Sequence, residues 1–317
     1  MVIEAFGFVV VSAVQNPSMQ SRISIAVVVA AMMLGSACHS VAQEAMAAKP
    51  AELWYSEQFT VHSESVGRDF LIQVAKPVKP QTGKVQVVYL LDGNSLFGQV
   101  ANWAIASGYY GPNAAYVVGI GYPDQDYGQS LGLRAHDFLS GPLPPALQHS
   151  PVAASIKGAA DSAGGAGFQK FLLQELRPII ERRYPVDPRR SILAGHSLGA
   201  LFASHVMLNA AGAFNEYLLC SPSIWLEPQL LDKASAFSSA LPVRVFVGYG
   251  SKEDQQLAES QMSKNAQELT ARLRNHASGT EVSLMTFEGR DHGSSLPDCL
   301  SQGLLTLLPA PPATTSH

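Results

Sequence analysis

The sequence predicts an α/β protein whose mostly parallel central sheet is covered by helices on both faces. Short apolar runs, typical of strands buried on both faces, alternate with helical patterns along most of the chain, and no internal repeat is present. One of these runs ends in a Gly-x-Ser-x-Gly turn that leads directly into a helical pattern. At 317 residues, with 47% apolar and 15% charged residues, the chain can build a large core.

Charge and cysteine content exclude several classes of protein. The formal net charge is −4 and the chain has no basic run, so nucleic-acid binding has no electrostatic support. Cysteines occur only at positions 38, 220 and 299, which make neither a disulfide framework nor a metal cluster. We find no zinc-ligand spacing, no phosphate-binding loop and no dinucleotide fingerprint. The sequence therefore predicts no metal and no organic cofactor.

The first part of the chain, residues 1–42, is interpreted as an export signal region whose true start is Met19. Arg22 supplies the positive charge, Ile23 to Leu34 the apolar core, and Ser40-Val41-Ala42 a small-residue cleavage site. The core is too short for a spanning helix, so no transmembrane span is expected in the mature protein. The alternative is a lipoprotein anchored at Cys38. The export signal predicts a periplasmic or secreted protein. In either case the compartment is oxidising, and Cys220 and Cys299 there either pair or remain separate buried thiols.

A single domain is expected over residues 52–308, followed by a disordered tail at 309–317. Two strand-like runs with a Ser/Gly turn between them predict an antiparallel hairpin at the start of the domain. The predicted strands are Glu57–His62, Asp69–Ala75, Val85–Leu91, Ala115–Ile120, a run around Ile192, Glu216–Ser221, Val243–Gly248 and Val282–Glu288. The predicted helices begin near Ser95 and after Ser197, and cover Phe168–Tyr184, about Gln255–Asn275 and Leu296–Leu308.

The segment from Gly121 to Gly167 breaks this alternation. It holds five prolines and eight glycines and shows little periodicity. So long an irregular stretch is uncommon in a compact domain unless it has a function. It is interpreted either as a Gly/Pro-rich loop that covers a substrate or as a surface insertion.

The turn Gly195-His196-Ser197-Leu198-Gly199 carries the strongest chemical signal. A serine between a strand and a helix is held in a strained backbone conformation and projects above the end of the sheet. The glycines allow the strand and the helix to approach. Leu198 begins the helix, so its N–H can bind an oxyanion formed at Ser197.

Two further polar groups follow later strands of the sheet. Glu253 follows the run Val243–Gly248, with Asp254 beside it as the alternative acid, and His292 follows the last strand. Carboxyl ends of parallel strands meet at one edge of a sheet, where ligands bind. The order serine, acid, histidine is that of the α/β-hydrolase fold, in which an imidazole takes the serine proton and a carboxylate orients the imidazole. His196 adjoins the serine and cannot easily reach its hydroxyl.

Other candidate residues complete the expected site. The second oxyanion donor is expected at the turn after Leu91, around Gly93. Trp225 and Phe97 either line a substrate pocket or belong to the core.

Several motifs together resemble the putative-esterase branch of the α/β-hydrolases, which includes trilactone siderophore esterases, feruloyl esterases and esterase D-like enzymes. The matching stretches are Tyr89-Leu90-Leu91-Asp92-Gly93-Asn94, Gly195–Gly199, Ser221-Pro222-Ser223-Ile224-Trp225, Gly250-Ser251-Lys252-Glu253 and Phe287–Gly293. The resemblance implies Ser197 as nucleophile, His292 as base and Glu253 rather than Asp254 as acid. It also implies that Arg134 lies near the substrate. Some siderophore esterases of the branch work with little help from an acid.

Three hypotheses for function follow. The first is an exported serine esterase acting on a small-molecule ester, such as a siderophore trilactone, through an acyl-enzyme. The second is an acyltransferase on the same scaffold, and the third is a hydrolase-like binding protein without turnover. The sequence predicts neither the particular ester nor the oligomeric state.

Overall fold

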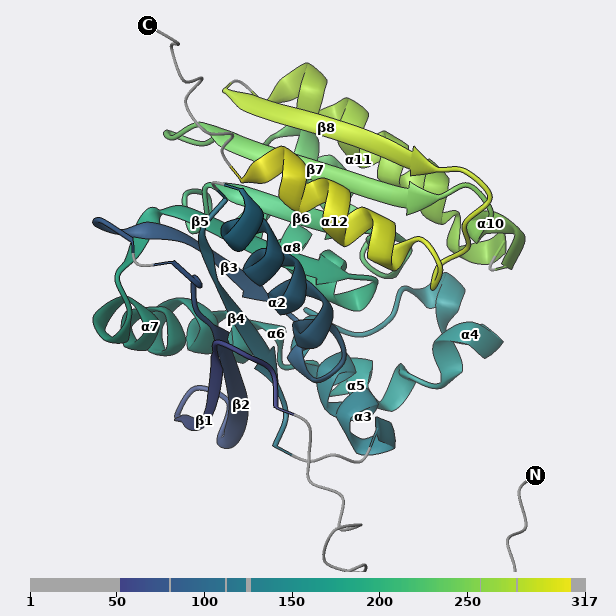
Figure 1. Ribbon diagram of the computed structural model, residues 1–317. Coiled ribbons are helices and arrows are strands. Elements are labelled where there is room, and N and C mark those ends of the chain that lie inside the picture. Colours follow the sequence, from purple (N-terminus) through teal and green to yellow (C-terminus); the bar gives the residue numbers. More distant parts are fainter. Residues whose placement is uncertain are drawn as a thin grey trace, which may run out of the picture. The chain divides into compact units, whose positions relative to one another are not determined.

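The computed structural model describes residues 52–79, 81–111, 113–123, 127–256, 258–277 and 279–308. The predicted export signal with Cys38 and the predicted tail at 309–317 lie outside these residues. The described chain forms one eight-stranded sheet with the strand order β1-β2-β4-β3-β5-β6-β7-β8 (Figure 1). The alternation of strands and helices thus produces the predicted α/β architecture.

The hairpin predicted at the start of the domain is present. β1 (Ser56–Ser63) pairs with β2 (Arg68–Ala75) in antiparallel register, with Ser56 opposite Ala75. Gly67, at φ 75°, supplies the left-handed turn between them. β2 also runs antiparallel to β4 (Ala115–Gly121), which attaches the hairpin to the edge of the sheet.

The remaining strand pairs are parallel, as the continuous apolar runs predict. These strands are β3 (Val85–Leu90), β4, β5 (Val186–His196), β6 (Glu216–Cys220), β7 (Val243–Gly250) and β8 (Thr280–Phe287). β3, β4 and β6 are buried along their whole length. The carboxyl ends of the parallel strands therefore form one edge at which several loops meet.

Two hydrophobic clusters lie on opposite faces of the sheet. Side chains alternate along a strand, so β3 contributes to both clusters. Val88 and Leu90 face the smaller cluster, which contains side chains of α2 (Gly93–Tyr110) and α12 (Leu296–Leu307). Val87 and Tyr89 face the larger cluster. The larger cluster includes side chains of α8 (Leu198–Asn209), α9 (Gln229–Ser235) and α11 (Met262–His276). Figure 1 shows α2 and α12 side by side on one face of the sheet. This two-sided burial confirms the predicted fold class.

The segment 121–167 is more regular than the expected Gly/Pro-rich loop. It contains α3 (Tyr127–Phe138), η1 (Pro145–Leu147), α4 (Pro151–Ala154), α5 (Lys157–Asp161) and the start of α6 (Gly165–Lys170). The prolines of η1 and α4 stand in their first turns, where a missing N–H costs nothing. Short helices without a long apolar stripe give little periodicity, which is why the sequence pattern does not predict them.

Two predicted helices differ in detail from the structure. The helix expected over Phe168–Tyr184 continues from α6 through a π-helical turn, η2 (Phe171–Leu176), into α7 (Arg177–Arg183). The π turn ends two residues before Pro178, whose missing N–H cannot extend the regular ladder of hydrogen bonds. The polar helix expected from about Gln255 is divided into α10 (Glu253–Gln256), η4 (Ala258–Ser260) and α11.

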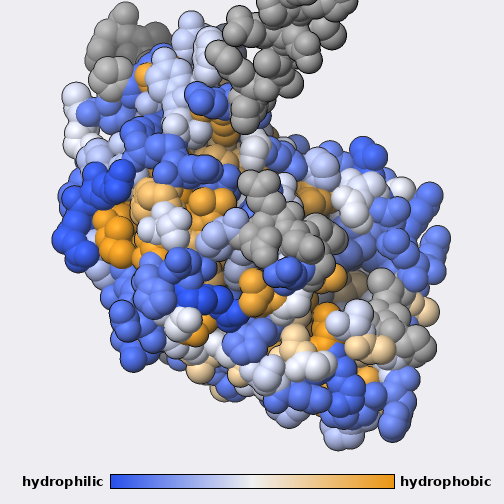
Figure 2. Space-filling view, turned by 90° about the horizontal axis from the view of Figure 1, so that it is seen from below, coloured by the Kyte–Doolittle hydropathy of each residue, from blue (hydrophilic) through white to orange (hydrophobic). Residues whose placement is uncertain are grey.

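Cys220 and Cys299, which the sequence left as a pair or as two thiols, form a disulfide between β6 and α12. Among the helices of the described residues, none combines the length and the hydrophobicity that a membrane span needs. The face seen in Figure 2 is mostly hydrophilic, and hydrophobic groups lie in small clusters between the charged and polar side chains.

Candidate active site

Ser197 lies on a strained turn between β5 and α8. Its backbone has φ 58° and ψ −117°, values that non-glycine residues rarely adopt. Ser197 N donates to Cys220 O at 2.9 Å, which holds the turn to β6. A β-carbon on Gly195 would lie 2.5 Å from the carbonyl carbon of Gly199, so only glycine allows the strand and the helix to meet here. The turn has the geometry expected for a nucleophilic serine.

His292 and Glu253 lie in contact, although they are 39 residues apart. His292 Nδ1 is 3.0 Å from Glu253 Oε2. An ionised carboxylate only accepts hydrogen bonds, so Nδ1 carries the hydrogen and Nε2 remains as the basic nitrogen of the ring. This is the tautomer that a general base next to a serine requires.

Glu253 is 1% exposed and stays ionised because its oxygens are well bonded. Oε1 accepts hydrogen bonds from Gly250 N at 2.6 Å and from Ser221 Oγ at 2.7 Å. Burial alone raises the pKa of Glu253, but the hydrogen bonds from His292, Gly250 and Ser221 outweigh burial and hold the pKa below the usual value of 4.5. A charged carboxylate at neutral pH can stabilise an imidazolium at His292.

Asp254, the alternative acid, has a different role. Its Oδ1 accepts a hydrogen bond from Ser263 N at 3.1 Å, and its Oδ2 contacts Ser263 Oγ. Both oxygens thus bind the first turn of α11, a common position for a helix-capping carboxylate. The geometry therefore favours Glu253 over Asp254 as the partner of His292.

Two cavities meet at Ser197. The smaller one, of about 160 Å³, contains Ser197, Glu253 and His292 and is otherwise largely apolar. Its other lining residues are Ile156, Leu198, Ser223, Trp225, Leu226, Ser260 and Met262. The larger cavity, of about 660 Å³, is lined by side chains from β1, β2, the start of α2, α3 and the loops after β3 and β4, and more of these residues are polar than apolar. The sequence did not decide whether Trp225 and Phe97 line a pocket or belong to the core. Trp225 lines the smaller cavity, whereas Phe97 is buried in the core.

His196 does not contact the serine hydroxyl but supports the histidine loop. Its Nε2 donates to His292 O at 3.0 Å, and the two rings lie 4.6 Å apart. Burial, and then the nearby His292, lower the pKa of His196 to about 4. His196 is thus a neutral donor that holds the backbone of His292.

Arg134 reaches the site from α3. Its Nε and Nη2 donate to the two carboxylate oxygens of Asp92 at 2.6 and 2.8 Å. Such a two-point contact fixes the plane of the guanidinium. Asp92 directly follows Leu91 after β3 and has a left-handed backbone, with φ 57°. Asp92 and Arg134 both line the larger cavity, as does His196. The sequence did not identify Asp92 as the partner of Arg134.

The predicted oxyanion donors lie at two helix starts. Leu198 is the first residue of α8, directly after the serine. Gly93 is the first residue of α2, and a β-carbon there would lie 2.8 Å from Ile120 N. Its lack of a side chain thus serves the contact with β4. The following residues, Asn94 and Ser95, line the larger cavity.

Three serines contribute to the site without having been singled out as site residues. Ser223 Oγ is 3.3 Å from Ser197 Oγ, while Ser221 and Ser295 both contact Glu253 Oε1. Ser221 also has a left-handed backbone, with φ 48°. Two sequence signals could have identified Ser221: its place directly after a buried strand, and its position in the stretch that resembles the esterase branch. Within the described ranges, no group of three His, Cys, Asp or Glu residues is arranged to hold a metal ion.

The sheet, the strained serine turn and the order of the site residues define an α/β-hydrolase. The family described as Putative esterase matches residues 63–292, and the chain belongs to this family. It is accordingly a carboxylic ester hydrolase.

Two curated relatives are similar over most of their length. The ferri-bacillibactin esterase BesA of Bacillus subtilis is 34% identical over 254 residues, which cover 76% of this chain and 86% of the relative. The siderophore triacetylfusarinine C esterase of Aspergillus fumigatus is 31% identical over 80% of this chain and 94% of its own.

Solved structures share the fold. A BES protein from Bacillus cereus superposes with a TM-score of 0.70 at 27% identity, covering 84% of this chain and 99% of its own. The siderophore hydrolase EstB from Aspergillus nidulans gives a TM-score of 0.68 at 27% identity, over 82% and 98% of the two chains.

Proposed function

We propose that this chain is an exported serine esterase that hydrolyses a carboxylic ester through an acyl-enzyme. The observation that carries the proposal is the 3.0 Å contact of His292 Nδ1 with Glu253, in the same cavity as Ser197. Ser197 is the nucleophile, His292 the general base, and Glu253 the acid that orients His292.

The reaction takes two steps. In the first, Ser197 Oγ attacks the ester carbonyl carbon, His292 Nε2 accepts the hydroxyl proton, and the histidine returns that proton to the departing alcohol. In the second, His292 deprotonates a water molecule that attacks the acyl-enzyme, and the carboxylic acid leaves as Ser197 regains its proton. Glu253 stays ionised and stabilises the imidazolium in both steps.

The oxyanion of each tetrahedral intermediate is held by backbone N–H groups. Leu198 supplies one donor and the start of α2 around Gly93 the other. Each such donor is typically worth about 3 kcal/mol of transition-state stabilisation. Helix starts suit this task because their N–H groups are free and their dipoles favour negative charge.

The proposed substrate is a siderophore ester of the trilactone type. The names of both curated relatives describe esterases of siderophores or their iron complexes. The larger cavity has room for a multi-armed ester and presents both polar and apolar groups to it, and the paired Arg134 and Asp92 lie at its wall. Trp225 contributes an apolar wall to the smaller cavity, against the part of the substrate next to the scissile bond. Export fits a substrate that the protein meets outside the cytoplasm.

The test compares wild type with Ser197→Ala on a panel of p-nitrophenyl esters, a feruloyl ester and a trilactone. We expect kcat to fall by about 10⁴ or more in Ser197→Ala, with the fold intact. Ser204→Ala is the matched control, because Ser204 lies on α8 with its hydroxyl bonded to Ala200 O, and it should keep wild-type turnover.

Two outcomes would remove the proposal or change the class. Near-native turnover in Ser197→Ala, or no labelling of Ser197 by a fluorophosphonate, would reject the serine mechanism. Products in which an added alcohol replaces water would indicate an acyltransferase. Cell fractionation of the full chain tests export.

A further inference from the structure

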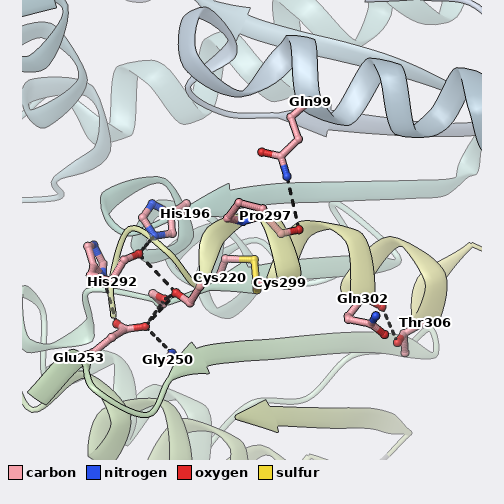
Figure 3. Close-up of a disulfide and its surroundings, with 12 residues drawn as sticks. Gln99, His196, Cys220, Gly250, Glu253, His292, Pro297, Cys299, Gln302 and Thr306 are labelled. Atoms are coloured by element: carbon pink, nitrogen blue, oxygen red, sulfur yellow. Dashed lines mark hydrogen bonds and ion pairs between the residues drawn. A yellow bond between two sulfur atoms is a disulfide. The ribbon is translucent and has the colours of Figure 1, made fainter. Parts of the chain in front are cut away.

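The Cys220–Cys299 disulfide lies directly beside the proposed active site. Cys220 is the last residue of β6, and Cys299 stands in the first turn of α12. Both are fully buried in the cluster between the sheet, α2 and α12. Figure 3 shows Glu253, His292 and His196 gathered at one side of the disulfide, with Gln302 and Thr306 farther along the helix.

The backbone around Cys220 contacts both the serine and the acid. Cys220 O accepts the hydrogen bond of Ser197 N at 2.9 Å. The next residue, Ser221, donates its hydroxyl to Glu253 Oε1 at 2.7 Å and its N–H to Gly248 O at 2.7 Å. A shift of β6 at Cys220 would therefore move Ser197 and one support of Glu253 together.

The backbone around Cys299 carries the histidine loop. Cys299 N donates to Ser295 O at 2.9 Å, one helical turn earlier. Ser295 Oγ lies 3.3 Å from Glu253 Oε1 and 3.4 Å from His292 O, and Ser295 N donates to Asp291 O at 3.0 Å. The start of α12 thus contacts the same oxygen of Glu253 as Ser221 does, with the two serine hydroxyls 3.4 Å apart, and fixes the chain next to His292.

We propose that the disulfide is a positioning element that sets the distance between the serine turn and the acid–histidine pair. This inference rests on the proposed function. One covalent bond joins two backbone segments that both contact Glu253 Oε1, and the other contacts between these segments are hydrogen bonds and apolar packing. Catalysis is sensitive to such spacing, because a displacement of about 1 Å can cost about 10²-fold in rate. Since the bond forms only in an oxidising compartment, full turnover would follow export.

A purely stabilising cross-link predicts a different result. It would lower the unfolding temperature when removed but leave the turnover of folded enzyme unchanged. The double variant Cys220→Ala/Cys299→Ala is therefore compared with Leu304→Ala, a core truncation in the same cluster and on the same helix. Circular dichroism gives the unfolding temperature of each, and kcat and KM are measured for one ester well below both transitions.

We expect kcat of the double variant to fall about 10- to 100-fold, with KM within about threefold of wild type. The rate of fluorophosphonate labelling at Ser197 should fall in parallel. Leu304→Ala should lose thermal stability and keep kcat. Wild-type kcat and labelling rate in folded double variant would overturn the inference.

Reduction of the wild-type disulfide provides a second test, which applies even if the double variant does not fold. A dithiol reagent opens the bond of wild-type protein to two thiols and is itself oxidised to a cyclic disulfide, and alkylation with mass spectrometry gives the reduced fraction. Turnover should fall with the reduced fraction and return after reoxidation with oxidised glutathione. Unchanged turnover in reduced, folded enzyme contradicts the inference alone, whereas an inactive oxidised wild type contradicts the proposed function.

Discussion

Replacing Glu253 by glutamine tests the acid of the proposed site, which position along the sequence alone does not distinguish from Asp254. The substitution keeps the size of the side chain but removes its charge. Glutamine must also present an amide NH₂ to one of the donors that now face the carboxylate, which include His292 Nδ1, Gly250 N and Ser221 Oγ. The variant therefore loses both the charge beside the imidazolium and part of the orientation of His292.

The size of the effect follows from the geometry. In the transition state an imidazolium at His292 faces the carboxylate at contact distance. At about 4 Å and an effective dielectric constant of about 20, a pair of unit charges is worth about 4 kcal/mol. Since 1.36 kcal/mol corresponds to a factor of ten, kcat should fall by about 10³-fold. The replacement of a triad aspartate by asparagine in a serine protease costs about 10⁴-fold, so the electrostatic figure is a lower bound.

Steady-state kinetics on one p-nitrophenyl ester, with circular dichroism to verify folding, measures this loss. Asp254→Asn is the matched control, because Asp254 binds Ser263 at the start of α11 rather than His292. It should change stability by about 1 kcal/mol and kcat by no more than about twofold. The reasoning fails if folded Glu253→Gln keeps kcat within tenfold of wild type, or if the two variants lose equal activity.

Two further predictions concern pH and substrate size. The pKa of His196 in the folded protein is about 4, below the unfolded value of 6.5. The contribution of His196 to the free energy of unfolding is therefore complete above pH 6.5 and falls by up to about 3 kcal/mol as the pH drops toward 4. The free energy of unfolding, measured with urea, should depend less on pH in His196→Gln, which keeps an N–H donor, than in wild type. The same pH dependence in both proteins would refute this. Trp225→Ala enlarges the smaller cavity and should shift the substrate preference of the enzyme toward esters with longer acyl chains. Trp103→Ala, on α2, is the control and should leave this preference unchanged. An unchanged acyl-chain profile in Trp225→Ala would count against Trp225 as a wall of the cavity.

The sequence predicted most regular elements because periodicity reports burial. The runs at 85–91 and 115–120 became fully buried strands, and the antiparallel hairpin formed where two alternating runs flank a turn. The segment 121–167 was not predicted as helical because its helices are short and carry no long apolar stripe. The division of the helix after Glu253 also escaped prediction, since boundaries depend on capping contacts such as that of Asp254 with Ser263.

The sequence by itself determined the fold class and the local form of the serine turn, because alternating burial and the glycines at 195 and 199 act within a few residues. Which carboxylate meets His292, whether Cys220 pairs with Cys299, and which side chains surround Ser197 were decided only by the tertiary structure. These contacts join residues brought together by the parallel order of β3, β5, β6, β7 and β8 at one edge of the sheet. Spacing along a chain carries no information about such distances, because each depends on how several separate elements pack against the same sheet.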